Sequence, residues 1–255
     1  MIHEIASRSN PRVRALAAEL DGLYVYEGDR LVRDLLARRE PLRLLVAHHR
    51  HRQLALNAAA ENIWLTDRPV LDRLSRLRDA PDLIAVIPPP KPGLNLERAE
   101  VVVVLDRVQD PANAGTAFRC AAAFGLDGMV LAGDTVRPWN PRFMRAAQTS
   151  LLDVPFQILP GLDELFSLKQ ASHFNVYLTA AAPPAERGLS PGEMRIPCLV
   201  VVGHEGRGID HRWFFQHPVV HIPQSGLVDS LNAGVSACIL MYELQRSGKI
   251  GVAER

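Results

Sequence analysis

Cysteine and long hydrophobic runs are both scarce in this chain of 255 residues. The three cysteines, Cys120, Cys198 and Cys238, are odd in number and far apart, and no CxxC pair occurs. This pattern predicts reduced thiols of a cytoplasmic protein, not a disulfide framework or a zinc site. The longest apolar runs span about five residues, whereas a membrane helix needs about 20. The first residues also lack the apolar core of a secretion signal, so we expect a cytoplasmic protein outside the membrane.

An excess of one charge is missing as well, because 29 basic residues face 28 acidic ones and the net charge is +1. Overall charge therefore gives no argument for nucleic-acid binding. Residues 1–98, however, carry 16 basic and 13 acidic residues, and the remainder carries 13 and 15. Only three of the basic residues are lysines. Arginine suits bidentate phosphate contacts, but a high-GC genome would favour arginine equally, and both interpretations stay open.

The composition is that of a globular protein, with 47% hydrophobic and 22% charged residues. The length favours two compact units. A boundary is indicated at PPPKPGLN, residues 88–95, because clustered prolines interrupt helices and central strands. We expect an N-terminal domain of residues 1–88, a linker of residues 89–98 and a C-terminal domain of residues 99–255.

Strands and helices alternate in both predicted domains, which indicates the α/β class. In the first domain we expect helices at residues 10–20, 29–39, 53–60 and 70–77, and strands at 23–26, 43–47, 63–66 and 83–87. In the second we expect strands at 101–105, 129–131, 156–159, 176–178, 199–202 and 219–222, and helices at 113–124, 141–149, 162–170, after 210 and at 229–245. The β-branched run at 101–105 is typical of a parallel strand buried on both faces. The second domain is therefore predicted to be a parallel sheet with helices on both faces.

Three polar, glycine-bearing loops follow predicted strands of this sheet, at residues 106–115, 203–208 and 223–232. Ligands of such sheets bind beyond the carboxyl ends of the strands. A dinucleotide site would need G-x-G-x-x-G after the first strand, and the loop there has a single glycine. A Walker A lysine motif is also absent, which excludes a P-loop nucleoside triphosphatase.

Each of the three loops carries one motif, and the motifs follow one another in a fixed order. They are N-x-G-x-x-x-R at Asn113, Gly115 and Arg119, G-x-E-G-x-G at residues 203–208, and I-P with S-L-N at residues 222–232. Together they resemble the SpoU (TrmH-type) branch of the SPOUT RNA 2′-O-methyltransferases. The segments ASRSNPRVRAL, YVYEGDRLVRDLL and LDRLSRLRDAPDLIAVI also resemble the RNA-recruiting domain of that family. The resemblance covers nearly the whole chain.

The resemblance implies a C-terminal SPOUT domain with a trefoil knot and a small α/β RNA-recruiting domain before it. It implies transfer of a methyl group from S-adenosyl-L-methionine to a ribose 2′-hydroxyl, in ribosomal RNA in preference to transfer RNA, by a homodimer joined through the C-terminal domain. No metal is expected. The implied catalytic residues are Arg119, Asn113, Glu205, Ser230 and Asn232. The implied cofactor-binding residues are Thr179, Ala180, Gly203, His204, Glu205, Gly206, Ile222, Leu231 and Asn232. Two alternatives are a non-catalytic RNA-binding or ribosome-assembly protein of the same fold, and a methyltransferase that acts on something other than RNA.

Simpler structural roles compete with several of these assignments. Asn113 and Ser230 are candidate helix caps, and Glu205 is a candidate surface acid. Asn232 is expected inside the last helix, where capping does not explain it. The neighbours of Arg119 look buried, and an unpaired charge there would be costly without a phosphate or ribose partner.

The sequence departs from the family pattern at a few positions and leaves two clusters open. RAAQTS at residues 145–150, His204, Asp229 and Ala233-Gly234 stand where the family often has other residues. The run at residues 48–52, HHRHR, is compatible with a solvated turn, with RNA phosphate contact and, less well, with a metal site. The aromatic side chains of Tyr24, Tyr26 and Trp139 fit core packing better than base stacking.

Overall fold

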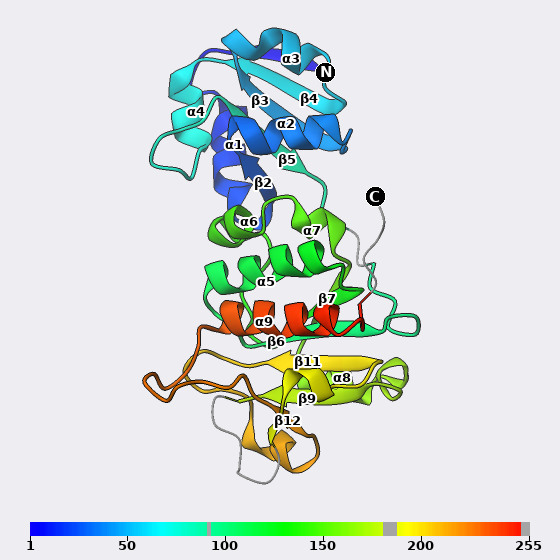
Figure 1. The fold of residues 1–255 in the computed structure, drawn as a ribbon. Helices are drawn as coiled ribbons and strands as arrows, with labels where there is room; N and C mark the ends of the chain where they lie inside the picture. Colours follow the sequence, from blue (N-terminus) through cyan, green and yellow to red (C-terminus); the bar gives the residue numbers. More distant parts are fainter. Residues whose placement is uncertain (91–92, 181–187, 251–255) are drawn as a thin grey trace. The chain divides into compact units, whose positions relative to one another are not determined.

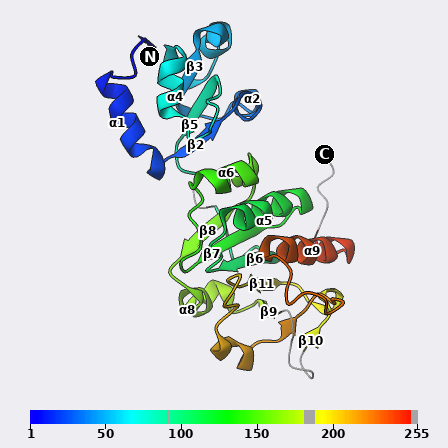
Figure 2. The ribbon, with the colours of Figure 1, turned by 90° about the vertical axis from the view of Figure 1, so that its left-hand side faces the viewer.

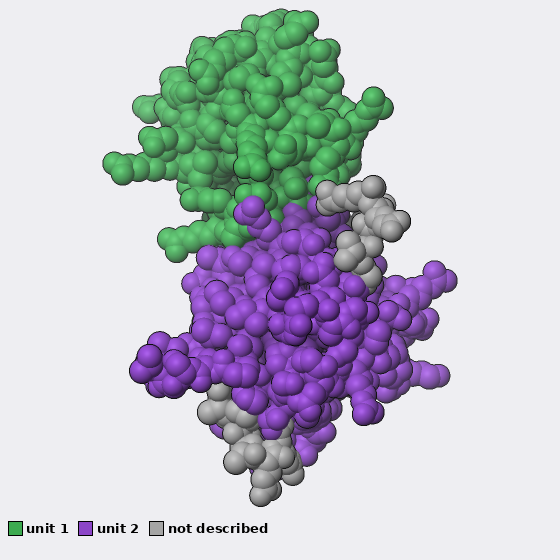
Figure 3. Space-filling model, viewed as in Figure 1, with its two compact units in different colours: residues 1–90, 138–149 green, residues 91–137, 150–255 purple. Residues whose placement is uncertain are grey.

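The computed structural model describes residues 1–90, 93–180 and 188–250. The chain divides into two compact units, one of residues 1–90 and 138–149 and one of residues 91–137 and 150–255 (Figure 3). Within the predicted linker, residues 91 and 92 lie outside the described residues, and Leu96 is buried in the core of the second unit. The division into domains 1–88 and 99–255 stays a prediction. None of the described helices combines the length and apolar character that a membrane crossing requires.

The first unit is built on a five-stranded mixed sheet in the order β1-β4-β3-β5-β2. β1, β4 and β3 run parallel, and β5 pairs antiparallel with β3 and β2. Its strands are β1 (Ile2–Ile5), β2 (Tyr24–Glu27), β3 (Leu42–His48), β4 (Ala60–Thr66) and β5 (Leu83–Ile87), and its helices are α1 (Pro11–Glu19), α2 (Asp29–Ala37), α3 (Arg52–Leu56), α4 (Arg68–Leu74) and α6 (Pro141–Ala147). α1 and α4 pack on one face of the sheet, and α2 and α3 contact its strands from the other (Figure 2).

Local sequence explains where these elements begin and where the expectations differ. Asn10 caps α1 as expected, because its side chain accepts a hydrogen bond from the Arg12 N–H. β1 was missed, since a four-residue edge strand with two isoleucines has little apolar pattern. The helix expected at 53–60 ends at Leu56, because the chain must already extend at Ala60 to pair with β3.

The second unit carries a seven-stranded sheet in the order β10-β12-β9-β11-β6-β7-β8, and every pairing in it is parallel. Its strands are β6 (Val101–Asp106), β7 (Gly128–Ala132), β8 (Phe156–Leu159), β9 (Asn175–Thr179), β10 (Gly188–Leu189), β11 (Cys198–Val202) and β12 (Val219–Val220). Its α-helices are α5 (Pro111–Phe124), α7 (Ser150–Asp153), α8 (Leu162–Ser167) and α9 (Ala233–Arg246). The predicted parallel α/β architecture is confirmed; the knot stays a prediction.

The two faces of this sheet are covered by different elements. Alternate residues of β6, β7 and β11 pack with α8 and with Trp213 of the short 3-10 helix His211–Phe215. α5 and α9 lie side by side on the other face, against β7 and β11 (Figure 1). The helix expected at 141–149 is interrupted, because Gln148 adopts φ +55° and α7 starts afresh at Ser150.

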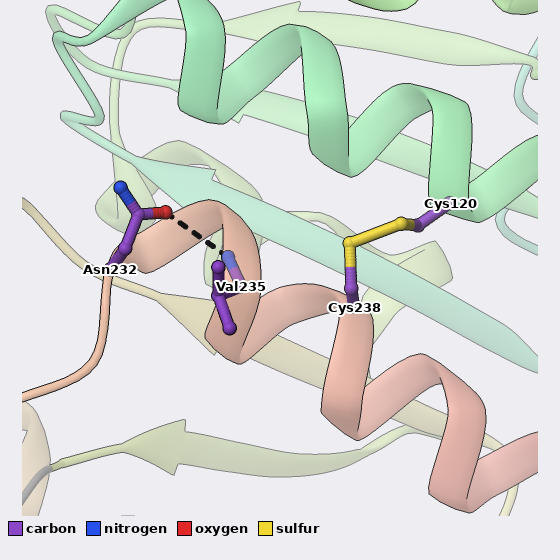
Figure 4. The surroundings of a disulfide bond; sticks show 4 residues. All are labelled: Cys120, Asn232, Val235 and Cys238. Atoms are coloured by element: carbon purple, nitrogen blue, oxygen red, sulfur yellow. Dashed lines mark hydrogen bonds between the residues drawn. A yellow bond between two sulfur atoms is a disulfide. The ribbon is translucent and has the colours of Figure 1, made fainter.

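A disulfide joins α5 to α9, so the expectation of three reduced thiols is wrong for two of them. Cys120 and Cys238 point toward each other from the two helices, and their Cα atoms are 5.6 Å apart (Figure 4). Their separation of 118 residues hid this pairing, which depends on the packing of the two helices. Cys198 is free and buried, and burial raises the pKa of its thiol to about 12.

Candidate active site

A cavity of about 670 Å³ lies in the second unit, beyond the ends of β9, β11 and β12. Its volume is within the usual range of about 300–1,000 Å³ for small-molecule sites. All nine residues expected to bind cofactor line it: Thr179, Ala180, Gly203, His204, Glu205, Gly206, Ile222, Leu231 and Asn232. Asn113 and Ser230 line it too. The structure therefore brings the three predicted loops to one cavity.

A chain of side-chain hydrogen bonds ties the loops together. The Asn113 Nδ2 donates to Glu205 Oε1 at 2.9 Å, and the Asn232 Nδ2 donates to Asn113 Oδ1 at 2.6 Å. The Asn232 Oδ1 then accepts from the Val235 N–H at 3.1 Å (Figure 4). A carboxylate only accepts and a backbone N–H only donates, so the two ends of the chain agree on one orientation for both amides. Each of the three loops thus supplies one member of a single, directed network.

Glu205 is more than a surface acid, because its carboxylate also accepts from the backbone N–H groups of Asp110 at 3.1 Å and Gln109 at 3.3 Å. Burial tends to raise the pKa of this carboxyl group. The hydrogen bond from Asn113 and those from backbone N–H groups outweigh burial and hold the pKa below its ordinary value. Glu205 is therefore ionised near neutral pH and fastens the second loop to the first.

The second loop closes tightly on itself. A Cβ at Gly203 would lie 2.6 Å from the Gly208 carbonyl carbon, so this position accepts no side chain without a shift. His204 Nδ1 accepts from the N–H groups of Gly206 at 2.9 Å and Arg207 at 3.3 Å. A ring nitrogen that accepts carries no proton, so neutral His204 has its proton on Nε2. His204 therefore shapes the loop and keeps one donor.

The helix caps differ from the expectations. α5 is capped by Asp110, whose side chain accepts from the Ala112 N–H, and Asn113 lies buried inside the first turns. α9 begins at Ala233 and is capped by Asn232, so two expectations are wrong: a helix from residue 229, and Asn232 inside it where capping does not explain it. Ser230 is not the cap. The Asn232 side chain is fixed in this role, because its Nδ2 donates to Asn113 Oδ1 while its Oδ1 accepts from the Val235 N–H. The next turn packs closely on α5, since a Cβ at Gly234 would approach the Asn113 carbonyl oxygen to 2.9 Å. α9 begins where its backbone meets α5.

Arg119 does not line the cavity of its own chain. Its side chain is exposed, so the expectation that burial makes its charge costly is wrong. The buried neighbours Ala117, Phe118 and Ala121 point to the opposite side of α5. Six residues along a helix correspond to about 9 Å and about 600° of rotation, which turns Arg119 well away from Asn113. Among the residues that the structure describes, no carboxylate forms an ion pair with Arg119.

Sequence reasoning missed two further features of this region. Arg107 follows β6 with φ +57°, and its guanidinium contacts both Asp106 and the Gly208 carbonyl. Near the third loop, buried Gln224 Oε1 and His221 Nδ1 lack hydrogen-bond partners within the described ranges. Gln224 lines the cavity, and an orphaned acceptor there fits a ligand that donates hydrogen bonds. A positive φ at a non-glycine residue cannot be read from composition, so no signal marked Arg107.

In the first unit, the run at residues 48–52 forms an ion-pair network around buried Asp82. His51 Nε2 lies 3.3 Å from carboxylate oxygens of Asp82 and Asp29, and Arg68 Nη2 lies 2.8 Å from Asp82 Oδ1. No three potential metal-binding side chains converge within residues 1–90, 93–180 and 188–250. Tyr24 and Tyr26 are buried, and Tyr24 meets Trp139 edge-on at 6.0 Å. Core packing is therefore confirmed for these tyrosines.

Comparison with known proteins gives the family. A family model described as the SpoU rRNA Methylase family matches residues 100–242. An uncharacterized tRNA/rRNA methyltransferase of Synechocystis sp. is 31% identical over 201 residues, which cover 75% of this chain and 70% of that protein. The 23S rRNA (guanosine(2553)-2'-O)-methyltransferase RlmP of Bacillus subtilis is 35% identical over 158 residues, which cover 60% of this chain and 61% of RlmP.

Solved structures agree with the fold. The SpoU methyltransferase AviRb from Streptomyces viridochromogenes is 25% identical with a TM-score of 0.76, covering 93% of this chain and 97% of AviRb. An AdoMet-bound rRNA methyltransferase from Sinorhizobium meliloti is 22% identical with a TM-score of 0.80, covering 96% of this chain and 98% of that one, and so shares the fold. Because the matched residues 100–242 run from the start of β6 into α9 and contain all three loops of the cavity, the chain belongs to the SpoU rRNA methylase family.

Proposed function

We propose that this protein transfers a methyl group from S-adenosyl-L-methionine to a ribose 2′-hydroxyl of RNA, and that ribosomal RNA is its substrate. One observation carries the proposal: the Glu205–Asn113–Asn232 chain joins the three family motifs around one cavity. The relatives named as 2'-O-methyltransferases of 23S rRNA support the substrate class. Ribosomal RNA as substrate implies a cytoplasmic protein.

The cavity fits this cofactor in chemistry as well as in volume. Thr179, Gly203 and Leu231 present the ends of three segments around it, and close packing at Gly203 leaves backbone groups to face a ligand. The unpartnered Gln224 Oε1 is an acceptor suited to an amino or hydroxyl group of the cofactor. When bound, S-adenosylmethionine supplies a methyl group that its positively charged sulfonium has already activated.

The protein's remaining task is to position the ribose and to help its hydroxyl lose a proton. Arg119 is the cation we assign to this task. A guanidinium stays protonated at ordinary pH, so Arg119 does not take the proton, which passes to solvent water; Arg119 stabilises the developing alkoxide and grips an adjacent phosphate. Because Arg119 faces away from its own cavity, we propose that it serves RNA bound at the cavity of a second copy.

Asn113, Glu205 and Asn232 act as positioning residues in this scheme. Their polar groups hold one another, and they fix the starts of α5 and α9 relative to the glycine loop. Ser230 has an exposed hydroxyl on the cavity wall and is assigned to the ribose or the methionine part of the cofactor. No step in this scheme uses a metal ion.

Residues 1–88 are assigned to RNA recruitment. Their fold is a separate sheet with its own core, and residues 1–98 hold the excess of positive charge, 16 basic against 13 acidic. Phosphate contacts dominate the affinity of most nucleic-acid-binding proteins and weaken with salt.

The test has two parts. Purified protein is titrated with S-adenosylmethionine by calorimetry, with and without ribosomal RNA, and 2′-O-methyl groups are then mapped in total RNA from cells with and without the gene. We expect binding at one site per chain and the loss of one methylated ribosomal position in the deletion strain. No cofactor binding, even with RNA present, would support a non-catalytic RNA-binding protein. Binding with an unchanged methylation map would contradict the RNA substrate.

A further inference from the structure

Arg107 occupies an unusual position beside the cavity. It follows the buried strand β6, and its backbone has φ +57°, in the left-handed region that side-chain-bearing residues seldom adopt. Its N–H donates to the Ala132 carbonyl at 3.0 Å, so the neighbouring strand holds this conformation. Strained backbone of this kind persists where the surrounding structure enforces it, often near functional sites.

The guanidinium of Arg107 is held by a buried carboxylate. The Arg107 Nε and Nη2 donate to Asp106 Oδ2 at 3.1 and 3.0 Å. Asp106 is only 3% exposed, and a buried carboxylate needs such a partner. Gly133 makes room for the arginine stem, because a Cβ there would lie 2.9 Å from Arg107 Cγ. The direction of the guanidinium is therefore set by groups outside the cavity.

The same guanidinium reaches the glycine loop. The Arg107 Nη2 donates to the Gly208 carbonyl at 3.3 Å. Gly208 lines the cavity, has φ +63°, and donates its own N–H to the His204 carbonyl at 2.8 Å. Arg107 itself does not line the cavity. Arg107 therefore contacts the cavity-lining residue Gly208 from outside the cavity.

We propose that Arg107 is a positioning residue for cofactor binding. Its guanidinium is held by Asp106 and fixes the Gly203–Gly208 loop through a hydrogen bond to the Gly208 carbonyl. This inference rests on the proposed function, because it assumes that the loop holds S-adenosylmethionine. It adds a residue outside the three motifs. It also accounts for the left-handed backbone of Arg107, because in that conformation the side chain reaches Gly208 across the carboxyl ends of the strands.

Three variants separate this role from simple support of the fold. Arg107→Asn keeps a residue that tolerates the left-handed region but removes the guanidinium. The double variant Asp106→Asn/Arg107→Asn also removes the buried charge that the first change leaves unpaired. Arg107→Lys keeps the charge without the planar fork. Arg195→Ala is the control, because it removes an exposed guanidinium of the same unit that lies outside the cavity.

The readouts are calorimetric affinity for S-adenosylmethionine, the KM values for cofactor and RNA, and thermal unfolding. We expect Arg107→Asn and the double variant to weaken cofactor binding by about threefold to tenfold, the usual effect of one lost hydrogen bond. The KM for RNA should stay within about twofold, as should every value for the control. The double variant should regain thermal stability relative to the single one, because it buries no unpaired charge.

One result would overturn the proposal: a double variant that binds cofactor as tightly as the wild type, which would mean that Arg107 only neutralises Asp106. A rise in the KM for RNA equal to that for cofactor would also contradict it. If Arg107→Asn does not fold, the double variant still decides the question. Arg107→Lys should also weaken cofactor binding, because a point charge cannot bond Asp106 and the Gly208 carbonyl together. Failure of the proposed function is seen separately, because the wild-type protein itself would then show no binding.

Discussion

Asn113 is held at both ends of its amide, by Glu205 on one side and Asn232 on the other. A side chain engaged in this way has little freedom to move with a substrate. Arg119 is different, because it is exposed and forms no ion pair with the rest of the described chain. At the scale of single residues, the hydrogen-bonded side chains therefore hold the loops together, and the exposure of Arg119 suits the role proposed for it.

Replacement of this cation gives the first prediction. Arg119→Ala should reduce methyl transfer by at least about a hundredfold, the order expected when an alkoxide-stabilising group is lost, while thermal unfolding stays unchanged because the side chain is exposed. Arg119→Lys should rescue poorly, since a point charge does not reproduce the planar fork. Transfer of labelled methyl to RNA is the measurement, and Arg195→Ala, which removes another exposed guanidinium outside the cavity, is the control. Near-normal transfer by the alanine variant would remove Arg119 from the mechanism.

Glu205 gives a pH-dependent prediction. Its folded-state pKa lies below the ordinary 4.5. Its charged form therefore contributes stability that is fully present above about pH 4.5 and is lost as the pH falls through the lower folded value. Cofactor affinity should be constant from pH 8 to about pH 4.5 and should decline only as the pH falls through the lower folded-state pKa of Glu205. Glu205→Gln should bind cofactor about tenfold more weakly at pH 7.

Calorimetry across this pH range measures the effect. Glu193→Gln is the matched control, since hydrogen bonds from Ser190 likewise lower the Glu193 pKa, at a site that does not line the cavity. Unchanged affinity in Glu205→Gln would show that the charge on Glu205, which accepts hydrogen bonds from the first loop, is dispensable for cofactor binding.

At the scale of elements, the helix pair α5 and α9 is cross-linked by Cys120–Cys238. The bridge closes a loop of 118 residues, and disulfides that close long loops typically stabilise by about 2–4 kcal/mol. The oxidised protein should therefore have a free energy of unfolding about 2–4 kcal/mol above that of the reduced protein. Guanidinium unfolding with and without dithiothreitol measures the difference. A double Cys120→Ser/Cys238→Ser variant should not respond to the reductant, and an equal response of both proteins would contradict the bridge.

The same elements show what the sequence predicts and what it leaves open. Apolar segments predict most strands of both sheets, because burial patterns are local, but not the short strands β1 and β10. The start of α9 was not predictable, since Asp229, Ser230 and Asn232 are all good caps and the choice depends on contact with α5. The Cys120–Cys238 pairing and the exposure of Arg119 depend in the same way on which helix faces meet. The meeting of the three loops was predictable because each follows a strand of one parallel sheet, whereas the individual cavity residues were implied by the family resemblance.

At the scale of the whole molecule, α9 has more apolar surface than its own unit covers. Ala237, Leu240 and Met241 are buried, whereas Val235 is 46% and Tyr242 is 47% exposed. A helix that only packs on its own sheet would not need these two side chains at the surface. They support the proposal that a second copy of the chain covers this face. Light scattering at micromolar concentration should then give twice the chain mass of 28.2 kDa.

A dimer of this kind makes a sharper prediction about the active site. If Arg119 serves the cavity of the partner, then Arg119→Ala chains and Glu205→Ala chains should complement each other at a cofactor concentration too low for Glu205→Ala to bind. In a mixed dimer one site carries both changes and the other carries neither, so random mixing should restore about a quarter of wild-type methyl transfer.

Val235→Asp/Tyr242→Asp should give a monomer that still binds cofactor but transfers no methyl group, whereas Phe215→Asp, at another exposed apolar residue, should remain dimeric. A wild-type mass of 28.2 kDa would rule out the dimer, and mixed dimers without activity would return Arg119 to the cavity of its own chain.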